Sequence, residues 1–178
     1  QGVVRIGVTS DKAAKTDGII YRKDASSPWE TLATFSKDSP SWSPLEFDHD
    51  GKTLYVASNL KEDTRGIYKY DLEKRQMGDL LFRDDTYDAS GLIYSDYRKA
   101  PIGVRYSKEK PAQVWFDEEK KVVQEIIDNT YPDTLNFISS MDENETQYVV
   151  VSFSDVQAPF YTLFSLKDGS LRRTPLRY

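Results

Sequence analysis

The feature that most constrains the fold of this chain is an internal repeat with a period near 47 residues. Four segments rich in aromatic and β-branched residues end at polar positions spaced 47, 46 and 48 residues apart, namely Asp24, Asp71, Asp117 and Ser165. An extended run precedes each segment, and the last three of these runs start 48 and 46 residues apart, at Thr53, Pro101 and Gln147. Two independent strand positions therefore share one period. A unit of roughly 40–50 residues with four short antiparallel strands is the size of one β-propeller blade.

The repeat divides the 178-residue chain into about four blade units, approximately 3–36, 44–83, 90–129 and 134–175. In the last three units a further strand comes first, whereas Val4–Val8 already aligns with the second strand of the others. Because the first unit lacks this inner strand, we expect part of a larger propeller rather than a closed one. The predicted fold class is all-β: a single partial β-propeller domain over residues 1–178, with about four blades of four-stranded antiparallel sheet.

Residues 118–128 depart from the strand pattern. They place Val122, Val123, Ile126 and Ile127 at helical spacing, while the charged residues of this segment, including Lys120, fall largely off that face. Asp117 precedes the segment and is a suitable N-cap. We therefore predict one short inserted helix near 118–128, in the place of the third unit's outer strand, that packs through its Val and Ile side chains. A β-strand with charged edges is the alternative.

The composition limits the kinds of catalytic site that the chain can hold. It has no cysteine, which excludes disulfides, thiolate zinc sites and a cysteine nucleophile. Its one histidine, His49, precedes the turn dipeptide Asp50-Gly51, so we expect an exposed turn residue rather than a member of a buried triad. The sequence contains neither a Gly-x-Ser-x-Gly nucleophile elbow nor a glycine-rich phosphate loop. We therefore assign no catalytic residue, no cofactor-binding residue and no cofactor.

Charge and hydropathy limit the partners. The formal net charge is −5 with both signs mixed along the chain, which argues against a nucleic-acid surface. No apolar run approaches the roughly 18 residues of a membrane span, and the first residues do not resemble a signal peptide. The compartment stays open, because a cysteine-free chain is compatible with either side of a membrane.

Metal and glycosidase chemistry are also not favoured. Two acidic turns, 48–51 and 142–145, contain the first ligand spacings of a calcium loop, but neither has the glutamate at position twelve that completes it. We therefore assign no metal ligand. A propeller glycosidase would need a central pair of carboxylates, and the 29 acidic residues, spread over turns, single out no pair.

Two stretches carry a resemblance to known families. Residues 47–59, from Phe47 to Asn59, resemble the blade motif that TolB-like propellers share with propellers of the prolyl oligopeptidase family. Residues 91–175 are more discriminating. Their order resembles the N-terminal propeller of bacterial acylaminoacyl-peptidase or dipeptidyl-peptidase-like members of that family. The matching segments are Arg98–Tyr106, Trp115–Asp117, the helix-like run, the Tyr131-Pro132 break, Asn136–Ser140 and Val149–Asp155.

The resemblance implies that the parent protein is a serine peptidase in which the propeller caps an α/β-hydrolase domain carrying Ser, Asp and His. No triad motif of the family matches a position here, so we expect this chain to be inactive alone. Its implied role is to gate or position peptide substrates, with the parent's α/β-hydrolase domain and the peptide as partners. The loops 61–65 and 155–159 are candidates to face that domain.

Two further expectations concern other partners. Open blade edges and apolar faces predict self-association of the chain. The alternative to the peptidase role is a TolB-like, non-enzymatic propeller that binds a protein partner.

Overall fold

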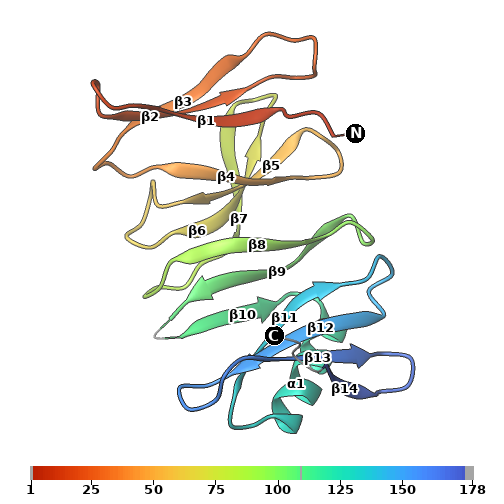
Figure 1. Ribbon diagram of the computed structural model, residues 1–178. Helices are drawn as coiled ribbons and strands as arrows, with labels where there is room; N and C mark the ends of the chain where they lie inside the picture. Colours follow the sequence, from red (N-terminus) through yellow and green to blue (C-terminus); the bar gives the residue numbers. More distant parts are fainter. Residues whose placement is uncertain (1, 109, 175–178) are drawn as a thin grey trace. The chain divides into compact units, whose positions relative to one another are not determined.

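The computed structural model describes residues 2–108 and 110–174, and within them it contains four antiparallel sheets and one helix (Figure 1). Residue 1, residue 109 and residues 175–178, which include the last residue of the fourth predicted unit, lie outside the described residues. In each sheet, strands that follow one another in the chain are also neighbours. The first sheet contains β1 (Ile6–Asp11), β2 (Thr16–Tyr21) and β3 (Glu30–Ser36); the second contains β4 (Trp42–Phe47), β5 (Thr53–Ser58), β6 (Gly66–Asp71) and β7 (Gln76–Phe82).

The other two sheets follow the same pattern. The third contains β8 (Ala89–Ser95), β9 (Ala100–Ser107) and β10 (Pro111–Trp115); the fourth contains β11 (Leu135–Met141), β12 (Gln147–Phe153), β13 (Phe160–Ser165) and β14 (Leu171–Thr174). Helix α1 (Glu118–Thr130) comes between them in the chain. The first sheet lacks a front strand, as the repeat predicts. A helix follows the third strand of the third sheet, as the spacing of apolar residues in 118–128 predicts. The predicted all-β fold class is confirmed, and it is consistent with part of a β-propeller.

The chain forms two compact units. The first comprises residues 2–92 and 106–108. Within it, aliphatic and aromatic side chains of the first and second sheets share one core. The fully buried members of this core include Leu54 and Val56, and the Trp42 ring packs at a tilt against Tyr70 with ring centroids 4.9 Å apart.

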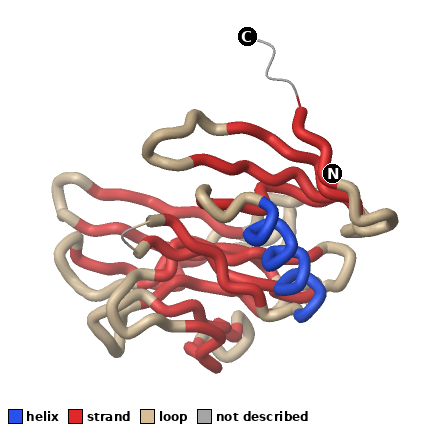
Figure 2. The backbone as a smooth tube through the Cα atoms, turned by 90° about the horizontal axis from the view of Figure 1, so that it is seen from below, coloured by secondary structure: helices blue, strands red, loops and turns tan. Residues whose placement is uncertain are grey.

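The second unit comprises residues 93–105 and 110–174. Its core joins the third sheet, α1 and the fourth sheet. Trp115 of β10, Val123 and Ile127 of α1, and Val150 of β12 belong to one buried cluster. Helix α1, drawn in blue in Figure 2, contacts β10 and β11.

The helix is confirmed, but the prediction of its buried face is partly wrong. It runs two residues past the predicted end, and the Asp117 side chain caps it by accepting from the Lys120 backbone N–H. Val123 and Ile127 are fully buried, whereas Val122 is 54% exposed and Ile126 is 40% exposed. Lys120, expected off the packed face, is fully buried. The positions 120, 123 and 127 recur at helical spacing, so the buried face is rotated toward Lys120.

The turn after the front strand repeats a backbone conformation in three sheets. Gly51, Lys99 and Glu145 lie 48 and 46 residues apart, and their φ angles are 66°, 54° and 55°. Glycine adopts this left-handed region without steric cost, whereas any other residue incurs about 1–2 kcal/mol. Glu145 is only 4% exposed. A buried, charged side chain thus occupies the turn position that glycine fills in the second sheet.

Candidate functional site

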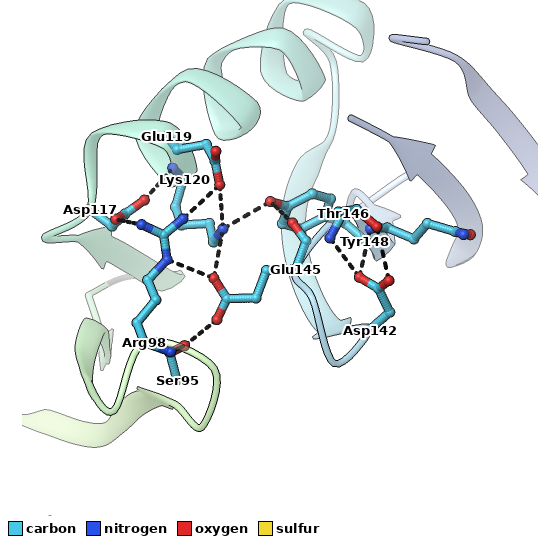
Figure 3. A network of polar contacts seen from close by, with 10 residues as sticks. Ser95, Arg98, Asp117, Glu119, Lys120, Asp142, Glu145, Thr146 and Tyr148 are labelled. Atoms are coloured by element: carbon cyan, nitrogen blue, oxygen red, sulfur yellow. Dashed lines mark hydrogen bonds and ion pairs between the residues drawn. The ribbon is translucent and has the colours of Figure 1, made fainter. Parts of the chain in front are cut away.

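A network of ion pairs and hydrogen bonds in the second unit is the candidate functional site (Figure 3). Four parts of the unit contribute to it: the end of β8 and the turn after it, the N-terminus of α1, the β11–β12 turn, and β12. The side chains of the network belong to Ser95, Arg98, Asp117, Glu119, Lys120, Glu145 and Tyr148.

Arg98 joins three carboxylates. Its Nε lies 2.8 Å from Oε2 of Glu145, and its Nη1 and Nη2 lie 2.6 Å and 2.8 Å from carboxylate oxygens of Asp117 and Glu119. The Ser95 hydroxyl accepts from the Arg98 backbone N–H at 2.8 Å and donates to Glu145. The fork of the guanidinium thus connects the β8–β9 turn both to the helix N-terminus and to the β11–β12 turn.

Lys120 occupies the centre of the network. Its ammonium lies 2.8 Å from Oε1 of Glu119, 3.0 Å from Oε2 of Glu145 and 2.9 Å from the hydroxyl oxygen of Tyr148. An ammonium has three donors, and these three contacts use all of them. The Tyr148 hydroxyl in turn donates to the backbone carbonyl of Glu145 at 2.6 Å. The buried charge is therefore fully compensated.

The pKa values of the network favour its charged forms. Burial alone would raise the pKa of the Glu145 carboxyl, but hydrogen bonds from Ser95, Arg98 and Lys120 outweigh burial and lower that pKa. Burial alone would lower the pKa of Lys120, but hydrogen bonds to Glu119, Tyr148 and Glu145 raise it. Burial raises the pKa of the Tyr148 hydroxyl. The two buried ions thus stabilise each other, and neither is close to exchanging its proton at neutral pH.

The ion pairs and hydrogen bonds of the network can hold α1 against the strand turns of the second unit. Because every donor of Lys120 is bound inside the protein and its side chain is fully buried, the ammonium has no contact to offer a substrate. The network fixes the first turn of α1 to two strand turns of the second unit. We therefore interpret it as the device that positions the helix.

His49 is where the sequence places it. It lies in the β4–β5 turn with its side chain 58% exposed, and its ring Nδ1 is 3.1 Å from Oδ1 of Asp48. Asp50 accepts hydrogen bonds from the backbone N–H groups of Lys52 and Thr53, which closes the turn. The absence of catalytic, cofactor and metal residues stays a prediction.

The second acidic turn and the two candidate loops each connect neighbouring strands of one sheet. Asp142 accepts from the backbone N–H groups of Thr146 and Gln147, and these bonds lower its pKa. Loop 61–65 connects β5 with β6, and loop 155–159 connects β12 with β13, the equivalent connection of the fourth sheet. Within residues 2–108 and 110–174, no group of three or more histidine and acidic side chains could hold a metal ion. No helix in this part of the chain is long and apolar enough to cross a membrane.

Sequence reasoning missed the network apart from its capping residue, Asp117. Two signals could have found it. Lys120 shares the helical spacing of Val123 and Ile127, and Glu145 occupies the repeat position of Gly51. Arg98 carries no comparable signal, because a charged residue is ordinary in an exposed turn.

Comparisons with known proteins give a structural likeness only. Neither the family models nor the curated proteins yield a match. Among solved structures, a puromycin-hydrolysing peptidase from Mycobacterium tuberculosis has a TM-score of 0.50 at 10% identity, and the match covers 97% of this chain and 29% of that one. TolB from Acinetobacter baumannii has a TM-score of 0.49 at 14% identity over 99% of this chain and 45% of that one. A prolyl endopeptidase has a TM-score of 0.49 at 12% identity over 100% of this chain and 29% of that one.

Of these likenesses, the one with a TM-score of 0.50 bears on the fold. At 10% identity, the match to the puromycin-hydrolysing peptidase supports a shared fold and nothing about chemistry. The chain spans between 29% and 45% of the length of these structures.

Proposed function

We propose that this chain is the non-catalytic β-propeller portion of a serine peptidase of the prolyl oligopeptidase family, in which it gates or positions peptide substrates for an α/β-hydrolase domain. The observation that carries this proposal is the order of segments from residue 91 to residue 175, which resembles the propeller of that family. That stretch includes a helix where the third unit's outer strand would lie, and α1 occupies this place.

Two further observations support it. The strand repeat near 47 residues has the size of a propeller blade. One structure with a similar fold is a peptidase that is more than three times as long as the region matched. A peptidase of this architecture would admit short peptides and exclude folded proteins by steric restriction.

The experiment that tests the proposal begins with the complete reading frame of the parent protein. We expect a Gly-x-Ser-x-Gly motif followed by an aspartate and a histidine. The full-length protein should be labelled by a serine-directed fluorophosphonate and should cleave short chromogenic peptides but not folded proteins. The 178-residue chain should do neither.

Two outcomes would contradict the peptidase role. A reading frame without a hydrolase region would favour the TolB-like alternative, which the blade motif at residues 47–59 fits nearly as well. Peptide cleavage by the highly purified chain itself would contradict its non-catalytic role.

A further inference from the structure

The guanidinium of Arg65, in the first unit, binds the hydroxyl groups of two serines. It is half-buried, and it immediately precedes β6 at the end of loop 61–65. Its Nη2 donates to the Ser41 hydroxyl at 2.9 Å and its Nη1 donates to the Ser43 hydroxyl at 3.2 Å. Among the residues that the structure describes, no carboxylate forms an ion pair with this guanidinium.

The strand register explains why these groups converge. Trp42 pairs with Ser58, and Ser58 pairs with Gly66, so the start of β4, the end of β5 and the start of β6 lie side by side. Ser41 and Ser43 are two residues apart and therefore point to the same face of the sheet. Asn59 lies at the same edge, where its side-chain oxygen accepts from the Ser41 backbone N–H at 2.8 Å.

The backbone of Arg65 is held separately from its side chain. The Arg65 N–H donates to Oδ1 of Asp88 at 2.7 Å, and its carbonyl accepts from the Ala89 N–H at 2.9 Å. The next residue, Gly66, is closely packed, because a Cβ there would lie 3.0 Å from the Phe82 carbonyl oxygen. The acidic side chain bound to Arg65 thus contacts its amide and leaves the guanidinium to the two serines.

The Arg65 guanidinium and the two serine hydroxyls have more hydrogen-bond donors than their contacts with one another use. A guanidinium has five N–H donors, and the two serine contacts use two of them. Each serine accepts from Arg65, so its own O–H hydrogen can donate elsewhere. Arginine stays charged in proteins, and a half-buried charge held only by neutral hydroxyls is incompletely compensated. The complement of such a cluster is a planar anion that accepts in a bidentate manner.

We propose that Arg65, Ser41 and Ser43 form a binding site for a carboxylate, supplied by a short peptide through its C-terminus. The carboxylate accepts from the guanidinium and from the two serine hydroxyls, while Asn59 and Asp88 position the cluster. The preference for a peptide as the source of the carboxylate rests on the proposed function; the anion site itself rests on the geometry of the first unit.

The test is a titration of the 178-residue chain with N-acetyl-alanyl-alanine, as the free acid and as the C-terminal amide, followed by calorimetry or by amide chemical shifts. We expect the acid to bind and the amide to bind at least about tenfold more weakly, because the amide lacks the charge that Arg65 recognises. Equal binding of the two peptides would overturn the proposal, and so would the absence of binding by the acid.

Substitutions at and away from Arg65 test whether the peptide carboxylate binds at this cluster. Arg65→Gln should weaken acid binding by about tenfold or more, and Arg65→Lys should weaken it less, because lysine keeps the charge but loses the planar fork. Arg75→Gln is the matched control: it also removes one positive charge from the first unit, at the β6–β7 turn, where Arg75 pairs with Glu30. An unchanged affinity in Arg65→Gln, or an equal loss in Arg75→Gln, would refute the assignment.

The double variant Ser41→Ala/Ser43→Ala covers the case in which Arg65→Gln does not fold. It leaves the guanidinium in place, and it should weaken binding of the acid while leaving circular dichroism unchanged. An unchanged affinity of this variant for the free-acid peptide would contradict the proposed role of Ser41 and Ser43 in binding. The peptidase role is judged independently, by the reading frame, so failure of either proposal can be told from failure of the other.

Discussion

At the scale of single residues, the stability of the second unit depends on a few buried polar groups. Glu145 combines a left-handed φ of 55° with a nearly complete burial of its carboxylate. Both features are unfavourable alone, and the contacts to Ser95, Arg98 and Lys120 offset them. The local backbone therefore has this conformation because the tertiary contacts stabilise it.

Replacing Lys120 by methionine should destabilise the chain by about 2–4 kcal/mol, because the buried Glu145 carboxylate would lose one of its two cationic partners. The matched control is Lys121→Met. Lys121 is the next residue, its side chain is 45% exposed, and it forms an ion pair with the exposed Glu118, so the change should stay within about 0.5 kcal/mol. Urea unfolding at neutral pH measures both, and equal effects would contradict the role of the network.

The lowered pKa of Glu145 also predicts a pH dependence. Its pKa in the folded chain lies below the ordinary value of 4.5, so its stabilising effect is complete above that value and is lost as the pH falls through the folded pKa. Glu145→Gln should therefore be less stable than the natural chain at pH 7, and this difference should shrink toward pH 3. Glu143→Gln, an exposed change in the same turn, should show no such trend. Urea unfolding across this pH range measures the difference.

At the scale of elements, most of the fold can be predicted from the sequence, because strand position follows from a repeated pattern. Strand β5 begins at the predicted Thr53, β6 ends at the predicted Asp71, and the helix begins at the predicted residue after the predicted cap. The buried face of α1 could not be predicted in full. Lysine side chains are usually exposed to solvent, so the sequence predicts an exposed Lys120. In the structure, Glu145 of the β11–β12 turn and Tyr148 of β12 bind its ammonium and make its burial favourable.

Two neighbouring valines test which face of α1 is packed. Val123→Ala should cost about 2 kcal/mol, because the side chain is fully buried among Trp115 and its neighbours. Val122→Ala should change stability by less than about 0.5 kcal/mol, because Val122 is 54% exposed and alanine favours a helix. Thermal unfolding followed by circular dichroism measures both. A larger loss for Val122→Ala would place the packed face where the sequence alone predicts it.

At the scale of the whole molecule, the chain is a series of small sheets that leave strand edges unpaired. In the described part of the chain, β1 lies at an edge of the first sheet. Val8 of this strand is 63% exposed. Unpaired edges with apolar side chains favour contact with another copy of the chain. The network and the Arg65 cluster are less predictable than the sheets, because each joins side chains that lie far apart in the chain. Packing of α1 and the fourth sheet brings the network together, and the pairing of β4, β5 and β6 brings the Arg65 cluster together.

We expect the chain to self-associate as its concentration rises, with β1 contributing to the contact. Val8→Lys should shift the population toward the monomer, because a charge at an edge strand opposes pairing. Val122→Lys is the control, since it adds the same charge at a similarly exposed position on α1. Sedimentation equilibrium measures the mass. A natural chain that stays monomeric at high concentration would contradict the expectation.

The position of Trp115 makes it an intrinsic fluorescence probe for the docking of α1. Of the three tryptophans in the chain, Trp29 and Trp42 belong to the first unit and Trp115 belongs to the second. Trp115 is 4% exposed, and its indole N–H donates to Gln124 of the helix at 3.2 Å. In a chain with Trp29→Phe and Trp42→Phe, the remaining emission comes from this one indole. A red shift of that emission then marks the moment when the helix leaves the sheet, without any added dye.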